Sequence, residues 1–217
     1  MKHTLFLLAL LTLPVGAEAK LRAGAAVADI TPQKWPIRVI GNFGLTMANK
    51  AHDPLHVRAL VLEDGGTKIA IALIDNCIIK REELDRAKGI ASKRTGIPTN
   101  RILMAATHTH SAPPSRARAG DQIEELYVER LVTQAAEAVV LANSRLTPAR
   151  IGWSVVQVPE ELSNRRWFMR EGGLPPSPFG ATTDIARMNP PPGSDQLIHP
   201  AGGTDPGFSI VSVQTSE

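Results

Sequence analysis

The chain has 217 residues, a single cysteine and a formal net charge of +3. One thiol cannot form an internal disulfide, so the fold is not a small disulfide-stapled scaffold. The basic residues form no long stripe with interleaved aromatic residues, which argues against nucleic-acid binding. The length is sufficient for one large domain, or two small ones, with a hydrophobic core.

The first residues have the features of a secretory signal peptide. Met1-Lys2-His3 is positively charged, Thr4 to Val15 is apolar, and Ala17-Glu18-Ala19 fits the small-x-small cleavage pattern. Pro14 interrupts the apolar run well short of the ~20 residues that a membrane span needs. We therefore expect residues 1–19 to be cleaved and the protein to be exported, with a periplasmic, envelope-associated or secreted location.

The next part of the chain has the alternation of β-strands. A first strand is predicted over residues 21–30, followed by an irregular stretch over 33–49. Residues 56–62 and 67–74 read as a hairpin around the turn Glu63-Asp64-Gly65-Gly66. The second hairpin strand is nearly all apolar, which is typical of a central strand that is covered on both faces.

Helices and strands then alternate. A helix is predicted over 81–94, a short buried strand over 102–106, a long helix over 121–142 and a strand over 150–158. This order predicts an α/β fold with mixed β-sheet layers covered by helices, in which strand-helix-strand crossovers are parallel and lie beside the antiparallel hairpin. The following region is rich in proline and reads as loop, and a final strand is predicted over 207–215. That ending fits either an edge strand or an incomplete domain.

Two histidines follow the buried strand and mark the candidate site. In extended backbone His108 and His110, two residues apart, point to the same side, about 6.5–7 Å apart, so both imidazoles can face one cavity. Zinc binds neutral imidazole nitrogen, and catalytic zinc sites use three or more protein ligands and leave a position for water. The alternative is a pair of polar histidines with no ligand. Further candidate ligands are His52, Asp53, His56, Asp75, His199 and Asp205.

The lone cysteine follows the apolar run 69–74. Its predicted role is that of a buried, small apolar residue, because no activating residue lies near Cys77 in the sequence.

Several segments resemble the N-terminal portion of the neutral/alkaline, non-lysosomal ceramidase family. They are residues 23–26, 29–32, 52–55, 58–65 and 105–111. The most specific of them contains His108-Thr109-His110-Ser111, and the resemblance is strong up to Ser111 and thin after Val158. It implies a zinc amidohydrolase, secreted or membrane-associated, that splits ceramide into sphingosine and fatty acid. By the same resemblance His108 is a zinc ligand, with one Zn²⁺ per site, and His110 is catalytic, holding the substrate carbonyl or stabilising its oxyanion.

The sequence departs from the family pattern in two ways. Ser111-Ala112-Pro113-Pro114 stands where the family has Ser-Gly-Pro-Gly, which changes the freedom of the backbone there. The family's remaining zinc ligands and its serine, in an Asp-Val-Ser-Pro-Asn context, lie further along a longer chain, and no such serine motif is found here. We therefore expect residues 20–217 to be the N-terminal, incomplete part of a ceramidase-like hydrolase domain.

The resulting hypothesis is a zinc-dependent enzyme that, in its full-length form, hydrolyses the amide bond of ceramide or a related N-acyl lipid. The alternative is an exported, non-catalytic binding module or a degenerate relic of that fold. The expected partners are a small-molecule or lipid substrate and a peripheral membrane surface, with neither nucleic acid nor an obligate protein partner. Short basic loops, containing Arg116 and Arg118 and Arg165-Arg166, fit an anionic substrate group or a lipid headgroup.

Overall fold

The computed structural model describes residues 21–42, 44–180 and 183–215. The expected signal peptide, residues 1–19, lies outside these ranges. The described chain divides into two compact units: unit 1 contains the residues up to Arg150 and those from Val213 on, and unit 2 contains Ile151–Ser212.

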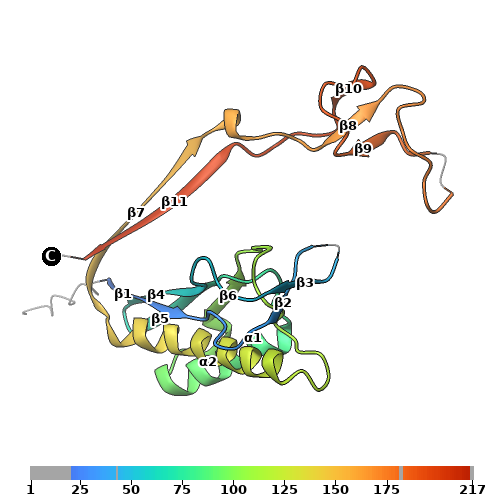
Figure 1. Ribbon diagram of the computed structural model, residues 1–217. Coiled ribbons are helices and arrows are strands. Elements are labelled where there is room, and N and C mark those ends of the chain that lie inside the picture. The colour runs from blue at the N-terminus through green and yellow to red at the C-terminus, as the bar shows by residue number, and fades with distance from the viewer. Residues whose placement is uncertain (1–20, 43, 181–182, 216–217) are drawn as a thin grey trace, which may run out of the picture. The chain divides into compact units, whose positions relative to one another are not determined.

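Unit 1 is built on a mixed β-sheet (Figure 1). Strands β1 (Arg22–Asp29), β4 (His56–Asp64) and β5 (Thr67–Ile74) are antiparallel neighbours, and β4 and β5 form the predicted hairpin. Strand β6 (Ile102–Ala106) lies parallel to β5 and is reached through helix α1 (Arg81–Thr95) and the 3-10 turn η1 (Thr99–Arg101). The α/β class and the first crossover are therefore confirmed.

The second predicted crossover is wrong in its geometry. Helix α2 (Gln122–Ser144) leads into β7 (Thr147–Gln157), but β7 pairs with β1 and not with β6. The pairing is antiparallel, so α2 carries the chain back across the sheet to its opposite side, where β11 (Gly207–Thr215) lies next to β7. Periodicity predicts that a strand exists, and it carries no information about which strand becomes its neighbour.

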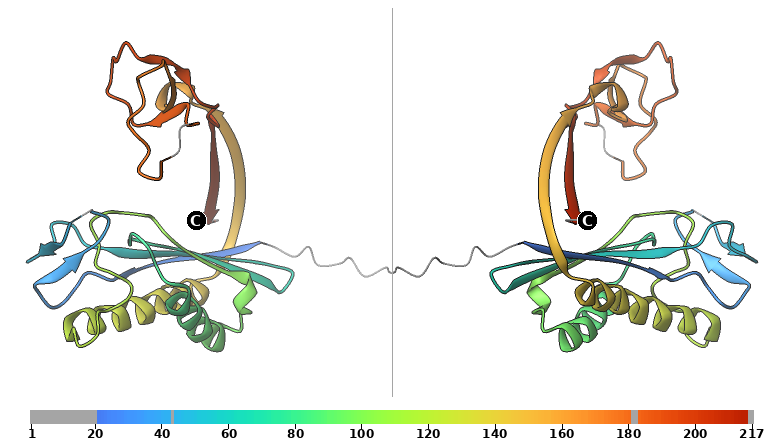
Figure 2. Two further views of the ribbon diagram at one scale, coloured as in Figure 1. Left: turned by 90° about the vertical axis from the view of Figure 1, so that its right-hand side faces the viewer. Right: turned by 90° about the vertical axis from the view of Figure 1, so that its left-hand side faces the viewer.

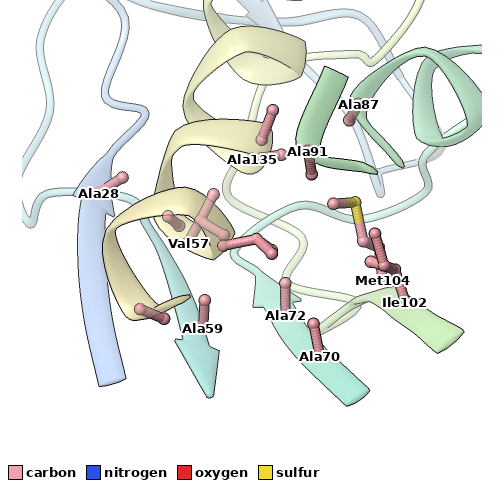
Figure 3. Packing of buried hydrophobic residues seen from close by; sticks show 14 of the residues in the cluster. Ala28, Val57, Ala59, Ala70, Ala72, Ala87, Ala91, Ile102, Met104 and Ala135 are labelled. Atoms are coloured by element: carbon pink, nitrogen blue, oxygen red, sulfur yellow. The ribbon is translucent and has the colours of Figure 1, made fainter. Parts of the chain in front are cut away.

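The core of unit 1 lies between the sheet and its two helices, which occupy the same face of the sheet in both views of Figure 2. Alternate residues of each strand point into it, as the pleat of a β-strand requires. Many of these buried residues are alanines, including Ala59 and Ala72 from the sheet and Ala135 from α2 (Figure 3). The helices therefore approach the sheet closely, and at Gly24 a Cβ atom would collide with the carbonyl oxygen of Ala142.

Short strands occur where the sequence predicted irregular structure. In unit 1, β2 (Ile37–Val39) and β3 (Thr46–Ala48) form an antiparallel pair. In unit 2, the short turn η2 (Pro159–Glu161) precedes a three-stranded sheet with the order β10-β8-β9, formed by β8 (Arg166–Met169), β9 (Ala186–Met188) and β10 (Leu197–Pro200). Strands of three or four residues are too short to produce a readable alternation.

No helix in the described part of the chain combines the length and the apolar character that crossing a membrane requires.

The close approach of β1 to α2 predicts opposite effects for two glycine substitutions. Gly24→Ala is expected to lower the free energy of unfolding by about 1–3 kcal/mol, because the added methyl group overpacks the β1–α2 contact. Gly89→Ala, inside α1 with open space around it, is expected to raise that free energy by about 0.5–1 kcal/mol through helix propensity. Urea unfolding measures both, and equal effects of the two substitutions would contradict the packing described here.

Candidate functional site

The candidate site forms where β5 and β6 leave the sheet together. Ile74 at the end of β5 pairs with Ala106 at the end of β6. The pairing continues beyond both strands, since the Thr107 N–H donates to the Ile74 carbonyl at 3.0 Å and the His108 N–H donates to the Asn76 carbonyl at 3.0 Å. His108 is thereby placed beside Cys77, although 31 positions separate them in the sequence.

The His108 side chain is held in one tautomer by the backbone. Its Nδ1 lies 2.7 Å from the Cys77 carbonyl oxygen, and a carbonyl oxygen only accepts hydrogen bonds, so Nδ1 carries the ring proton. In the neutral ring Nε2 then keeps its lone pair, which is the form of imidazole that zinc binds. A hydrogen bond from the second ring nitrogen to a backbone carbonyl is also the usual way in which proteins orient a metal-binding histidine.

His110 faces the same point in space. Its Nε2 lies 3.4 Å from Nε2 of His108, and the two rings meet edge to face with their centroids 5.0 Å apart. The sequence predicted that extended backbone would turn both imidazoles to the same side, and this explanation is wrong. The φ of His108 is 62°, in the left-handed region, which is uncommon for residues other than glycine. This turn in the backbone, and not strand alternation, directs the two side chains toward each other.

The two nitrogens fit a shared ligand. Two ligands of one tetrahedral zinc, each at ~2.0–2.1 Å, are about 3.3 Å apart, close to the observed separation of 3.4 Å. The same spacing also fits one metal ligand and one neighbour that contacts the group bound next to it. The donor set is therefore compatible with zinc in either arrangement.

Cys77 adds a sulfur atom to this group. Its Sγ lies 3.8 Å from Nδ1 of His108, and the side chain is buried, as the sequence predicted. Among the described residues, Cys77, His108 and His110 are the group whose potential ligand atoms all lie within 4.8 Å of one another. The contact of Cys77 with the site was not predicted, because it depends on the pairing of two strands that are distant in sequence.

Asn76 fastens the loop that follows His110. Its side chain is fully buried and donates to the Pro113 carbonyl at 3.0 Å and, more weakly, to the Tyr127 hydroxyl at 3.4 Å. Since its backbone carbonyl also accepts from His108, Asn76 holds both ends of the loop from His108 to Pro113. Burial raises the pKa of Tyr127 far above its ordinary value, so the phenol stays neutral.

The buried carboxylate of Glu124 joins helix α2 to β2 and to the segment that precedes the helix. Glu124 accepts from Arg38 Nε at 2.8 Å and Nη2 at 3.1 Å, and from the Arg118 backbone N–H at 2.8 Å. Burial acts to raise the pKa of Glu124, but the hydrogen bonds from Arg38 and Arg118 outweigh it and leave that pKa below its ordinary value. The Arg118 side chain is bound to Asp121 at 2.7 Å, so this guanidinium, expected to fit an anionic substrate group, is neutralised within the protein.

A cavity of about 620 Å³ opens beside His110, within the 300–1,000 Å³ range of small-molecule sites. Its walls come from β2, β3 and the segments that flank them, and from the loop containing Thr109, His110, Ser111 and Pro113. They are mostly apolar by area, with Trp35, Ile37, Val39 and Leu55 among them.

Three of the other candidate ligands, His52, Asp53 and Asp75, also line this cavity. The Asp75 carboxylate is already engaged by the His56 backbone N–H at 3.0 Å and by Arg58 at 2.8 Å. His56 begins β4, and its Nδ1 lies 3.5 Å from Nη2 of Arg58. The last two candidates, His199 and Asp205, lie in unit 2. His199 packs against Phe168, and Asp205 accepts from the Gly207 N–H at 2.9 Å, which is the role of a turn residue. The structure therefore does not gather these candidates around His108.

Comparison with known proteins identifies the fold. No protein-family model matches the chain, and no curated protein matches it significantly. Solved structures of ceramidases do share its fold. One is the neutral ceramidase from Pseudomonas aeruginosa, with a TM-score of 0.61 and 21% identity over 92% of this chain and 30% of that chain. Another is a ceramidase complexed with C2, with a TM-score of 0.60 and 21% identity over 92% of this chain and 29% of that chain.

The resemblance seen in the sequence is thus confirmed at the level of the fold. The chain spans about 30% of the length of the ceramidase chain that it matches, as expected for a resemblance to one portion of a longer enzyme.

The ion pair at Glu124 predicts a specific loss of stability in acid. The pKa of the Glu124 carboxyl is lowered in the folded state. Its contribution to the free energy of unfolding is therefore complete above the unfolded-state pKa of about 4.3, and it is lost as the pH falls through the folded-state pKa. Glu124→Gln is expected to lower the free energy of unfolding at pH 7 by about 3 kcal/mol, near the lower end for a broken buried pair because Arg38 is 25% exposed.

Urea unfolding between pH 3 and 7 measures this effect, and the variant should show a flatter pH dependence than the wild type. Glu129→Gln is the control, because Glu129 pairs with Arg86 on the surface and should contribute less than about 1 kcal/mol. Equal losses in the two variants would show that the Glu124 network is no stronger than a surface ion pair.

Proposed function

We propose that this chain supplies the His108–His110 portion of a zinc-dependent amidohydrolase of the neutral ceramidase type. The substrate is ceramide or a related N-acyl lipid, and the bond hydrolysed is its amide. The observation that carries the proposal is the Nδ1–H tautomer of His108, fixed by the Cys77 carbonyl, which leaves Nε2 free for a metal. The ceramidase fold of the chain supports it.

In this proposal the two histidines have different roles. His108 holds the metal through Nε2, and His110 binds the carbonyl oxygen of the substrate and stabilises the negative charge that develops on it. Preorganised donors directed at such a charge are among the largest contributions to catalysis. Zinc, when bound, polarises the carbonyl and makes water a better nucleophile at neutral pH. His110 is suited to its role by position, since its Nε2 is 3.4 Å from the nitrogen proposed to hold the metal.

The remaining ligands of the site are proposed to lie outside the residues described here, and no second protein is needed to supply them. A catalytic zinc site uses three or more protein ligands, and in this proposal His108 is the one ligand assigned within the group of Cys77, His108 and His110. The apolar cavity beside His110 would receive part of the substrate. We further propose export through residues 1–19 and a peripheral contact with a membrane surface, which would bring the site to a lipid substrate.

A non-catalytic binding module or a degenerate relic of the fold is the second candidate. One observation favours it: Ala112-Pro113-Pro114 stiffens the loop beside the site. Affinity for zinc separates the candidates, because a relic has no requirement to keep it.

Substitution of His108 tests the metal assignment. His108→Ala is expected to abolish the zinc binding of the chain, because the prealigned nitrogen is removed. Competition with a chromophoric zinc chelator measures the affinity. His199→Ala is the matched control, since His199 is an exposed histidine in unit 2 and its removal should leave the affinity unchanged. An unchanged zinc affinity after His108→Ala would show that His108 is not a zinc ligand.

The zinc-loaded chain alone is expected to be inactive toward a fluorescent ceramide analogue, because its set of protein ligands is incomplete. Release of the fluorescent fatty acid by the purified chain would contradict the proposal that further ligands come from outside it. The control is the same preparation carrying His110→Ala, which separates turnover at this site from contaminating activity.

A further inference from the structure

The turn between β2 and β3 lies directly against the His110 segment. The Ile40 N–H donates to the Ala112 carbonyl at 3.1 Å, and these two residues form an isolated antiparallel bridge. The next residue, Gly41, has a φ of 109°, a conformation that residues with a Cβ rarely adopt. The bridge therefore brings the backbone of this turn to the loop that carries both histidines.

Gly41 touches His110 itself. A Cβ atom built on Gly41 would lie 2.5 Å from Cγ, 2.6 Å from Cβ and 2.8 Å from Cα of His110, all shorter than real contacts allow. The hydrogen of Gly41 is thus the largest substituent that this position accepts while His110 stays in place. Both the φ and the contact require glycine, and they do so for independent reasons.

His110 depends on this contact because little else holds its ring. Its hydrogen-bond contact within the described part of the chain is Nε2 of His108, at 3.4 Å. His108, in contrast, is fixed by the Cys77 carbonyl and by its own hydrogen bond to Asn76. An exposed imidazole with one long contact keeps its direction only if its backbone and Cβ are confined.

We propose that Gly41 is a positioning residue for His110. It confines the Cα, Cβ and ring of His110 from the side of the β2–β3 turn, and so keeps Nε2 of His110 directed at Nε2 of His108. The inference rests on the proposed function for its importance to catalysis, while the contact itself is a property of the fold. A residue with no side chain would thereby set the distance between the two imidazoles.

The test uses the full chain and NMR spectroscopy of the histidine rings. The wild type should show nuclear Overhauser contacts from the Gly41 α-protons to His110 and between the rings of His108 and His110. Gly41→Ala is expected to lose the contact between the rings. Gly96→Ala is the matched control, because Gly96 also has a positive φ, of 75°, but open space where a Cβ would be; it should strain the backbone and keep the contact.

A second measurement separates this inference from the metal assignment. Co²⁺ added to the wild type should shift the His110 ring signals by its paramagnetism, less so in Gly41→Ala, and not at all in His108→Ala. If His108→Ala responds like the wild type, the metal assignment fails, and the contact between the rings still decides the role of Gly41. If Gly41→Ala keeps that contact, Gly41 is not a positioning residue.

If Gly41→Ala does not fold, the nuclear Overhauser contacts of the wild type decide whether Gly41 confines His110. Absence of the contact between the Gly41 α-protons and the His110 ring would overturn the inference.

Discussion

The parallel pairing of β5 and β6 is the constraint on which the site depends. Parallel neighbours end at the same edge of a sheet, and here Ile74 and Ala106 are paired at their last positions. The segments that follow continue side by side, so the backbone carbonyls of Asn76 and Cys77 become available to His108. An antiparallel arrangement of the same two strands would put these segments at opposite edges, and His108 would have no backbone acceptor to fix its tautomer.

Much of this arrangement could be predicted from the sequence. The hairpin of β4 and β5 is marked by alternation around a turn rich in glycine. Both long helices are marked by periodicity, and α1 also by the charges at its two ends. The position of β7 could not be predicted, because it depends on which edge of the sheet accepts a strand. Strands β8, β9 and β10 of unit 2 escaped prediction because each has only three or four residues.

The histidines of the site could be found by motif, whereas the residues that arrange them could not. Asn76 and Cys77 orient His108 through backbone carbonyls, and Gly41 acts by having no side chain, so no motif marks these roles. The side chain of Asn76 holds the loop through a contact that only the fold creates. Arg118 illustrates the opposite case. Its charge suggested an anionic ligand, but Asp121 and Glu124, which in the sequence look like acidic residues of a first helical turn, already neutralise it.

The alanine-rich contact between α2 and the sheet has a consequence for how the site tolerates change. Large core side chains can change rotamer around a substitution, but alanine has no alternative rotamers, so a larger residue in this contact is accommodated by a shift of the backbone. Helix α2 carries Tyr127 and Glu124 near its beginning and Ala135, Ala138 and Ala142 deeper in the core. A displacement of α2 at those alanines would therefore also displace Tyr127 and Glu124, whose side chains help to hold the loop that carries His108 and His110. The packing of this core and the position of the loop that carries His108 and His110 are thus coupled through one helix.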